Sequence, residues 1–122
     1  MNFFDSHAHI DDKIFNKDIK EVIARADEAG VASVMIVGTD VKSSERAVSL
    51  AESIDGYYAS VGVHPHDAKM CSESDIDFLL NLAKSPFVRA WGETGLDFNR
   101  MFSPAKEQEK WLMVSLLKTN KL

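Results

Sequence analysis

All four histidines of the chain fall into two pairs with one residue between the rings, His7/His9 and His64/His66. Each pair follows an apolar segment with the composition of a β-strand. Residues two apart on a strand point to the same face, so two imidazoles with this spacing can converge on one cation. A lone pair of this kind can equally be two partly exposed loop histidines. The pattern therefore indicates a metal site but leaves that plainer interpretation open.

Carboxylates accompany the histidines. Asp5 stands two residues before His7, where it can serve as a further ligand or accept the ring N–H of a ligand histidine. Glu93 follows another strand-like segment, so it belongs at the same end of a parallel sheet as both histidine pairs. A solvated loop carboxylate fits Glu93 too, but this alignment makes a metal ligand at least as good an interpretation. Two divalent ions bridged by a carboxylate would suit this set, and their chemistry would be activation of water.

Other polar residues near these motifs are candidates for substrate binding. His64 and His66 have a weaker claim to be ligands, because a binding rim also needs donors for substrate anions. We favour a phosphate contact for them over a structural role. Arg100 suits a phosphate clamp, and Asp97 suits a partner that holds the loop or orients a ligand. For Arg100 and Asp97 a solvated surface role fits the spacing equally well.

The apolar residues around Glu93 also have two interpretations. They could form a wall against which a nucleobase stacks. Ordinary packing in the core is the interpretation we favour, because buried positions are the default for such side chains. The residues concerned are Trp91, Phe98, Met101 and Phe102.

The elements that must position these residues alternate between short apolar and longer amphipathic segments, which is typical of a parallel sheet covered by helices. The expected strands are residues 2–6, 31–37, 57–63 and 87–92. The first expected helix begins at Ile14 and stops at Gly30, and the second has Ser43 or Ser44 as its cap. The third begins with a capping box of Ser72 and Asp75. The fourth begins at Ser103-Pro104 and runs to Leu122. Four βα units predict half of an eight-unit barrel, although a small open α/β sheet would give the same pattern.

Composition limits the class of protein. The chain has 122 residues, of which 45% are hydrophobic, so we expect one soluble globular domain or part of one. No basic segment precedes an apolar core at Met1 and no apolar run approaches membrane-spanning length, so we expect a cytoplasmic protein with no membrane association. Cys71 is the only cysteine, and we expect it to be a reduced thiol with no functional role. The net charge of −5 disfavours a broad electrostatic grip on nucleic acid, so DNA would have to be held locally, partly through metal ions.

Three motifs in order carry a family resemblance. They are Phe4-Asp5-Ser6-His7-Ala8-His9, Gly62-Val63-His64-Pro65-His66 and Gly92-Glu93-Thr94-Gly95-Leu96-Asp97-Phe98. Together they resemble the successive signatures of TatD-type metal-dependent hydrolases, and Asn99-Arg100-Met101 continues the likeness. The resemblance implies a (β/α)8 TIM barrel of the amidohydrolase superfamily, of which residues 1–122 are the first four βα units, a half barrel. It also implies a DNase activity that depends on two divalent ions, which would be Mg, Zn or Mn. The ligands that it implies are His7, His9 and Glu93.

In this family, two further histidine ligands and a catalytic aspartate come from later strands. The resemblance therefore implies that the general base lies beyond Leu122, and we expect residues 1–122 alone to be inactive. Two other functions remain open. The same ligands would support hydrolysis of a small ester, lactone or amide. The chain could also be a non-catalytic interaction fragment that self-associates through open sheet edges.

Overall fold

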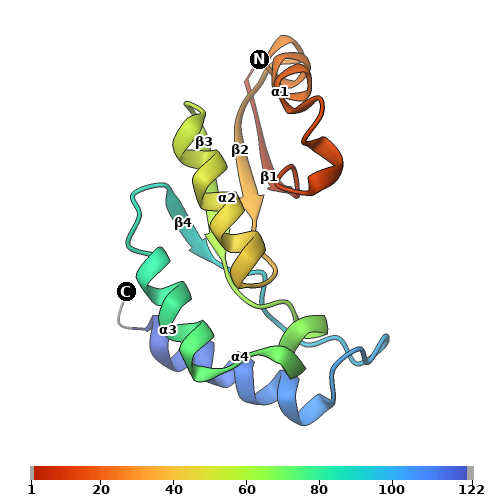
Figure 1. The fold of residues 1–122 in the computed structure, drawn as a ribbon, viewed down its shortest axis with the longest axis vertical. Coiled ribbons are helices and arrows are strands. Elements are labelled where there is room, and N and C mark those ends of the chain that lie inside the picture. The colour runs from red at the N-terminus through yellow and green to blue at the C-terminus, as the bar shows by residue number, and fades with distance from the viewer. Residues whose placement is uncertain (1, 121–122) are drawn as a thin grey trace.

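A single parallel sheet organises the chain (Figure 1). The structure, a computed structural model, describes residues 2–120. Its strands are β1 (Phe3–Ala8), β2 (Val31–Val37), β3 (Tyr57–Val61) and β4 (Val88–Trp91), hydrogen-bonded in the order β1-β2-β3-β4. Each strand pairs with the next one in sequence and all pairs are parallel. The order never reverses, as it would in a doubly wound sheet, so the expected α/β architecture is confirmed in its barrel-like, singly wound form.

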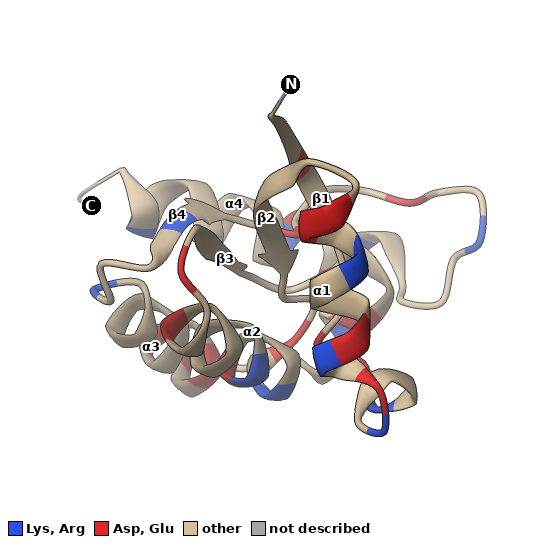
Figure 2. Cartoon of the chain, turned by 90° about the horizontal axis from the view of Figure 1, so that it is seen from above, with Lys and Arg blue, Asp and Glu red and all other residues tan. Residues whose placement is uncertain are grey.

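A helix follows each strand, and the first three helices connect successive strands. The helices are α1 (Ile19–Glu28), α2 (Val41–Ser53), α3 (Glu73–Leu82) and α4 (Ala105–Thr119), with short 3-10 helices η1 (Lys13–Phe15) and η2 (Pro65–Met70). Figure 2 shows α2 and α3 side by side beneath one face of the sheet, as the right-handed crossover rule requires. The core lies between them and the sheet, where Ile36, Val61 and Leu79 are fully buried. This core holds the carboxyl ends of β2 and β3 in a fixed place.

The first helix begins later than the periodicity predicts. Ile14 lies in η1 and is 76% exposed, whereas α1 begins at Ile19. The Asp12 carboxylate accepts the backbone N–H of Ile14 at 2.9 Å. Side-chain bonds of this kind offer the backbone an alternative to helical pairing. The prediction of a continuous helix from Ile14 was therefore wrong.

Two of the predicted caps were also wrong. Asp40, rather than Ser43 or Ser44, caps α2: its carboxylate accepts the N–H of Ser43 at 2.7 Å, and the Ser43 hydroxyl accepts the N–H of Asp40 at 2.9 Å. The reciprocal pair moves the helix start towards the amino end. Ser103 does not cap α4, because its hydroxyl oxygen accepts the backbone N–H of Lys69 at 3.0 Å and its proton goes to the His66 carbonyl at 2.6 Å. The predicted end of this helix at Leu122 lies outside the described residues.

The remaining boundaries agree closely with the sequence. The capping box of Ser72 and Asp75 at the start of α3 is confirmed. β1 continues two residues beyond its predicted end, to Ala8, while β3 ends at Val61 and β4 at Trp91. His7 therefore lies within β1, and His9 follows directly after it.

The outer edges of β1 and β4 have no strand partner among residues 2–120. Large apolar side chains are exposed as well, including Phe4 on β1 at 54% and Leu117 on α4 at 65%. Unpaired edges and exposed apolar area favour association, so self-association stays a prediction. Within the part of the chain that the structure describes, no helix has both the length and the apolar character needed to cross a membrane.

Candidate metal centre

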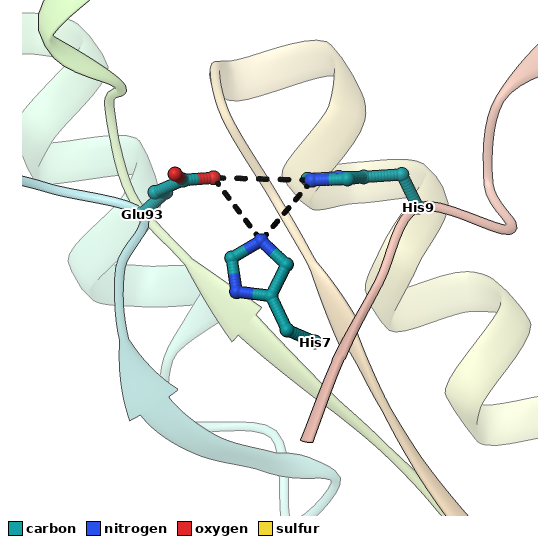
Figure 3. A group of neighbouring side chains, drawn as sticks. All are labelled: His7, His9 and Glu93. Carbon is teal, nitrogen blue, oxygen red and sulfur yellow. Dashed lines mark hydrogen bonds and ion pairs between the residues drawn. The ribbon is translucent and has the colours of Figure 1, made fainter. Parts of the chain in front are cut away.

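Three predicted ligands come together at the carboxyl end of the sheet. His7 and His9 approach from the end of β1, and Glu93 approaches from the segment after β4 (Figure 3). The two histidine Nε2 atoms are 3.2 Å apart, and Glu93 Oε2 lies 3.5 Å from that of His7 and 3.9 Å from that of His9. The predicted convergence of these side chains is therefore observed.

The spacing of these three atoms suits a single divalent ion. Two nitrogens bound to a tetrahedral ion at 2.0–2.1 Å are separated by about 3.3 Å, which matches the histidine pair. Two imidazoles and a carboxylate are a ligand set that zinc and other first-row ions accept. The site is also open, since the side chains of His7 and His9 are 53% and 46% exposed. The residues present therefore fit a metal ion with room for further donors.

A backbone carbonyl orients His9. Its Nδ1 lies 3.0 Å from the carbonyl oxygen of Val37, the last residue of β2. A carbonyl only accepts, so Nδ1 carries the proton and Nε2 turns its lone pair towards the site. Asp5 plays a different part from the one expected, because its carboxylate accepts the backbone N–H of His7 at 3.1 Å. It thus fixes the strand end, and within residues 2–120 its carboxylate has no hydrogen bond to an imidazole ring.

Backbone hydrogen bonds to the ends of β2 and β3 hold the segment that carries Glu93. The N–H of Glu93 donates to the Gly38 carbonyl at 2.8 Å, and the N–H of Gly92 donates to the Val61 carbonyl at 2.9 Å. Gly62 lies directly against this segment. A Cβ built on Gly62 would come within 2.7 Å of the Gly92 carbonyl carbon, so only glycine allows this approach. The carboxylate is therefore positioned by the sheet itself.

His64 contacts the other oxygen of Glu93. Its Nε2 lies 3.4 Å from Glu93 Oε1, while its Nδ1 accepts the backbone N–H of His66 at 3.0 Å. Because Nδ1 is an acceptor, the proton of the neutral ring sits on Nε2 and points at Glu93. Burial lowers the pKa of His64, although the Glu93 charge acts in the opposite direction. The His64 ring thus turns its Nε2 towards the Glu93 carboxylate, at the distance of an ion pair.

His66 and Asp97 form a second contact beside the centre. His66 Nε2 lies 2.5 Å from Asp97 Oδ2. Asp97 Oδ1 accepts the backbone N–H groups of Asn99 and Arg100, both at 3.0 Å. The Arg100 N–H and then the His66 ring lower the pKa of Asp97 to about 2. Asp97 therefore holds both His66 and the start of the loop that carries Arg100.

This arrangement predicts an acid-sensitive part of the stability. The pKa of Asp97 is lowered on folding from 3.8 to about 2, so its contribution is complete above about pH 4 and is lost as the pH falls towards 2. We expect Asp97→Asn to unfold more easily than the unmodified chain at pH 5, with the difference disappearing near pH 2. Urea unfolding followed by circular dichroism measures this. A difference that stays the same from pH 5 to pH 2 would contradict it, and Asp55→Asn, at an exposed site, is the control.

Gln108 on α4 closes the same loop and was not found from the sequence. Its side chain is 1% exposed. Oε1 accepts the N–H of Asp97 at 2.7 Å, and Nε2 donates to the carbonyls of Asp97 at 3.1 Å and Ser103 at 2.8 Å. The available signal was its spacing: Gln108, Trp111 and Ser115 are the buried residues of α4 and lie three and four residues apart, on one helical face.

We expect Gln108→Ala to lower the free energy of unfolding by about 2 kcal/mol, because it leaves buried backbone groups of the loop without partners. Denaturant unfolding is the measurement. Glu109→Ala, at an exposed neighbouring position of α4, should change stability by less than about 0.5 kcal/mol. Equal effects of the two substitutions would show that the Gln108 hydrogen bonds do not hold the loop.

The polar anchors of this loop turn its apolar side chains outward. Phe98, Met101 and Phe102 are 52%, 47% and 57% exposed, so the prediction that they pack in the core was wrong. Trp91 is partly buried and packs against the core. The difference arises because Trp91 belongs to β4, whereas the others lie in a loop whose buried contacts are made by Asp97, Ser103 and Gln108.

Comparison with known proteins decides the family. The family model described as TatD-related DNase matches residues 4–119. The chain belongs to this TatD family. The curated relative named 3'-5' ssDNA/RNA exonuclease TatD from Salmonella typhimurium is 40% identical over 113 residues, which are 93% of this chain and 44% of the relative. The exonuclease of the same name from Escherichia coli K12 is 38% identical over the same shares of both chains. The chain thus spans less than half the length of these relatives.

Solved TatD-family structures confirm the fold. YjjV, a TatD homologue from Escherichia coli K12, superposes with a TM-score of 0.85 at 30% identity over 94% of this chain and 45% of its own. A TatD-family hydrolase from Entamoeba histolytica gives a TM-score of 0.89 at 24% identity, over 99% of this chain and 46% of its own. The four βα units therefore correspond to the first half of a TatD barrel, as the motifs predicted.

Proposed function

We propose that the protein carrying this chain is a metal-dependent nuclease that hydrolyses phosphodiester bonds in single-stranded DNA or RNA. The observation that carries the proposal is the convergence of His7, His9 and Glu93, whose ligand atoms lie within 4.8 Å of one another. The strand-end position agrees with it, because barrel enzymes build their sites at the carboxyl ends of strands. The exonuclease names of the relatives support the substrate class.

A divalent ion bound here would supply Lewis-acid polarisation of a phosphoryl oxygen and activation of water. His7 and His9 would hold it through Nε2, and Glu93 through Oε2. Glu93 Oε1 lies 3.4 Å from His64 Nε2, so the His64 ring would help to orient the carboxylate. One ion takes at least four donor atoms, and residues 2–120 group three ligand atoms here. The second ion that we expect would therefore need further donors.

Substrate phosphate would be met beside the ion. The Arg100 guanidinium is a planar fork suited to phosphate, and its side chain is exposed. His66 Nε2 is engaged by Asp97, so Nδ1 is the ring atom left, and it would donate to a substrate oxygen only when the ring carries both protons. The Nε2–H of His64 would act on substrate only by leaving Glu93. Asp97 would act by orienting His66, and Asp5 by fixing the end of β1.

The proposal extends to the whole protein in three respects. Residues 1–122 would form part of one larger barrel domain, since the outer sheet edges need partners. The water-activating carboxylate would lie outside these residues, so the chain alone would bind metal with little turnover. A cytoplasmic location is the one we expect.

A chimaera tests the function while supplying the missing ligands. Residues 4–119 would replace the matching half of the Salmonella typhimurium exonuclease, and the product would be assayed with Mg²⁺, Mn²⁺ or Zn²⁺ on a 5'-labelled single-stranded oligonucleotide and on a small ester. Shortening of the oligonucleotide, lost in His9→Ala, is the expected result. Cleavage of the ester alone by a folded chimaera would favour the small-ester hydrolase and contradict the nuclease.

A further inference from the structure

The loop between β4 and α4 presents aromatic side chains to solvent beside the metal centre. It projects from the body of the molecule at the carboxyl end of the sheet (Figure 1). Phe98 is 52% exposed and Phe102 is 57% exposed, although phenylalanine is normally buried. Exposed aromatic rings near a candidate active site are candidates for binding a ligand.

These rings are presented by a loop that is anchored at both ends. Gln108 bonds the backbone of Asp97 and Ser103, and Ser103 is itself fully buried and bonded to η2. Phe102 also stands edge-on to the His66 ring, with centroids 4.7 Å apart and planes at 89°. The backbone on both sides of the aromatic positions is therefore held, and the Phe102 ring is packed against His66, before any ligand arrives, which lowers the entropy cost of binding.

A continuous row of contacts links this loop to the metal centre. Phe102 packs edge-on against His66, and the ring centroids of His66 and His64 are 4.2 Å apart. His64 Nε2 in turn lies 3.4 Å from Glu93 Oε1. A ligand lying on Phe102 is thus separated from the candidate ion site by two imidazole rings. That spacing suits a chain molecule with one unit at the ion and the next units along the loop.

Charge around the loop suits a phosphate backbone. Arg100 is exposed between the two aromatic positions. Lys69 on η2 is exposed as well, and its backbone N–H donates to the Ser103 hydroxyl at 3.0 Å, next to Phe102. Of the nearby acids, Asp97 is occupied by His66 and by backbone N–H groups, whereas Asp67 on η2 is exposed. The loop therefore offers cations locally in a chain whose net charge is −5.

We propose that Phe98 and Phe102 are a stacking platform for the bases of a single-stranded nucleic acid, with Arg100 against its phosphates. The inference rests on the proposed function and explains a preference for single strands. Every base has a π-face that can stack on an aromatic ring, whereas bases inside a duplex are already stacked on one another. Phe98 and Phe102 are binding residues in this account and take no part in bond cleavage.

Binding of two labelled oligonucleotides to the full 122-residue chain tests the platform. One is a thymidine strand and the other an abasic strand of equal length and charge. Fluorescence anisotropy in EDTA excludes any contribution from a metal ion. We expect the thymidine strand to bind more tightly, and Phe98→Ala and Phe102→Ala each to weaken it about tenfold while leaving the abasic strand unchanged. Phe98→Trp and Phe102→Trp should restore binding.

The matched control is Phe3→Ala, which removes a ring of similar exposure, 53%, at the amino end of β1. It should leave both affinities unchanged. Equal affinity of the unmodified chain for the two strands would overturn the platform, as would the same loss in Phe3→Ala. Metal titration of Phe98→Ala and Phe102→Ala, which should match the unmodified chain, separates this result from a failure of the metal centre itself.

Discussion

Glu93→Gln is expected to abolish metal binding at the centre and, in the complete enzyme, most nuclease activity, while the fold stays intact. The substitution keeps the volume of the side chain but removes its charge. It also presents an amide to the Nε2 atoms of His7 and His9, where Glu93 Oε2 now lies at 3.5 and 3.9 Å. Losing even an outer-shell partner typically costs about 10–100-fold in affinity, so losing a ligand should cost at least as much.

Isothermal titration with Mn²⁺ or Zn²⁺ measures the affinity, and oligonucleotide hydrolysis measures the activity. Glu45→Gln on α2, at an exposed position away from the centre, is the matched control and should behave as the unmodified protein. Unchanged turnover of Glu93→Gln at saturating Mg²⁺ would rule out the role given to Glu93.

Gly62→Ala is expected to damage both the fold and the metal centre. The new methyl group would lie 2.7 Å from the Gly92 carbonyl carbon and 2.9 Å from the Glu93 carbonyl oxygen. These are backbone atoms, so β4 and the segment carrying Glu93 must move. Overpacking of this kind costs about 1–3 kcal/mol, and the displaced carboxylate would no longer face the histidines.

Thermal unfolding and metal titration of Gly62→Ala would show a lower melting temperature together with weaker metal binding. Gly92→Ala is an informative comparison, because a Cβ there meets its nearest neighbour, the Thr94 nitrogen, at an ordinary 3.8 Å. Wild-type metal affinity in a stable Gly62→Ala protein would mean that the β3–β4 contact does not position Glu93.

The strand pattern and the grouping of the three candidate ligands could be predicted because both follow from side-chain type and spacing. Alternating apolar segments located all four strands, and residues at the carboxyl ends of parallel strands had to meet at one edge of the sheet. His7, His9 and Glu93 therefore converged as predicted. The capping box of Ser72 and Asp75 was readable for the same reason, since both partners are side chains at fixed spacing.

What the sequence could not predict depends on backbone atoms and on three-dimensional competition. The carbonyl of Val37 that orients His9, and that of Gly38 that holds Glu93, leave no mark in residue type. Ser103 has the sequence of a helix cap, but its hydroxyl accepts the backbone N–H of Lys69 and donates to the His66 carbonyl instead. The aromatic loop was assigned to the core because hydrophobicity alone favours burial, whereas polar anchors such as Gln108 turn it outward.

The central claim is that His7, His9 and Glu93 hold a divalent ion. Anomalous diffraction from crystals grown with Zn²⁺, recorded on both sides of the zinc absorption edge, tests it most directly. We expect a peak about 2.0–2.2 Å from His7 Nε2, His9 Nε2 and a Glu93 carboxylate oxygen, and no such peak in Glu93→Gln. An ion bound elsewhere, with these three side chains left without metal at saturating Zn²⁺, would contradict it.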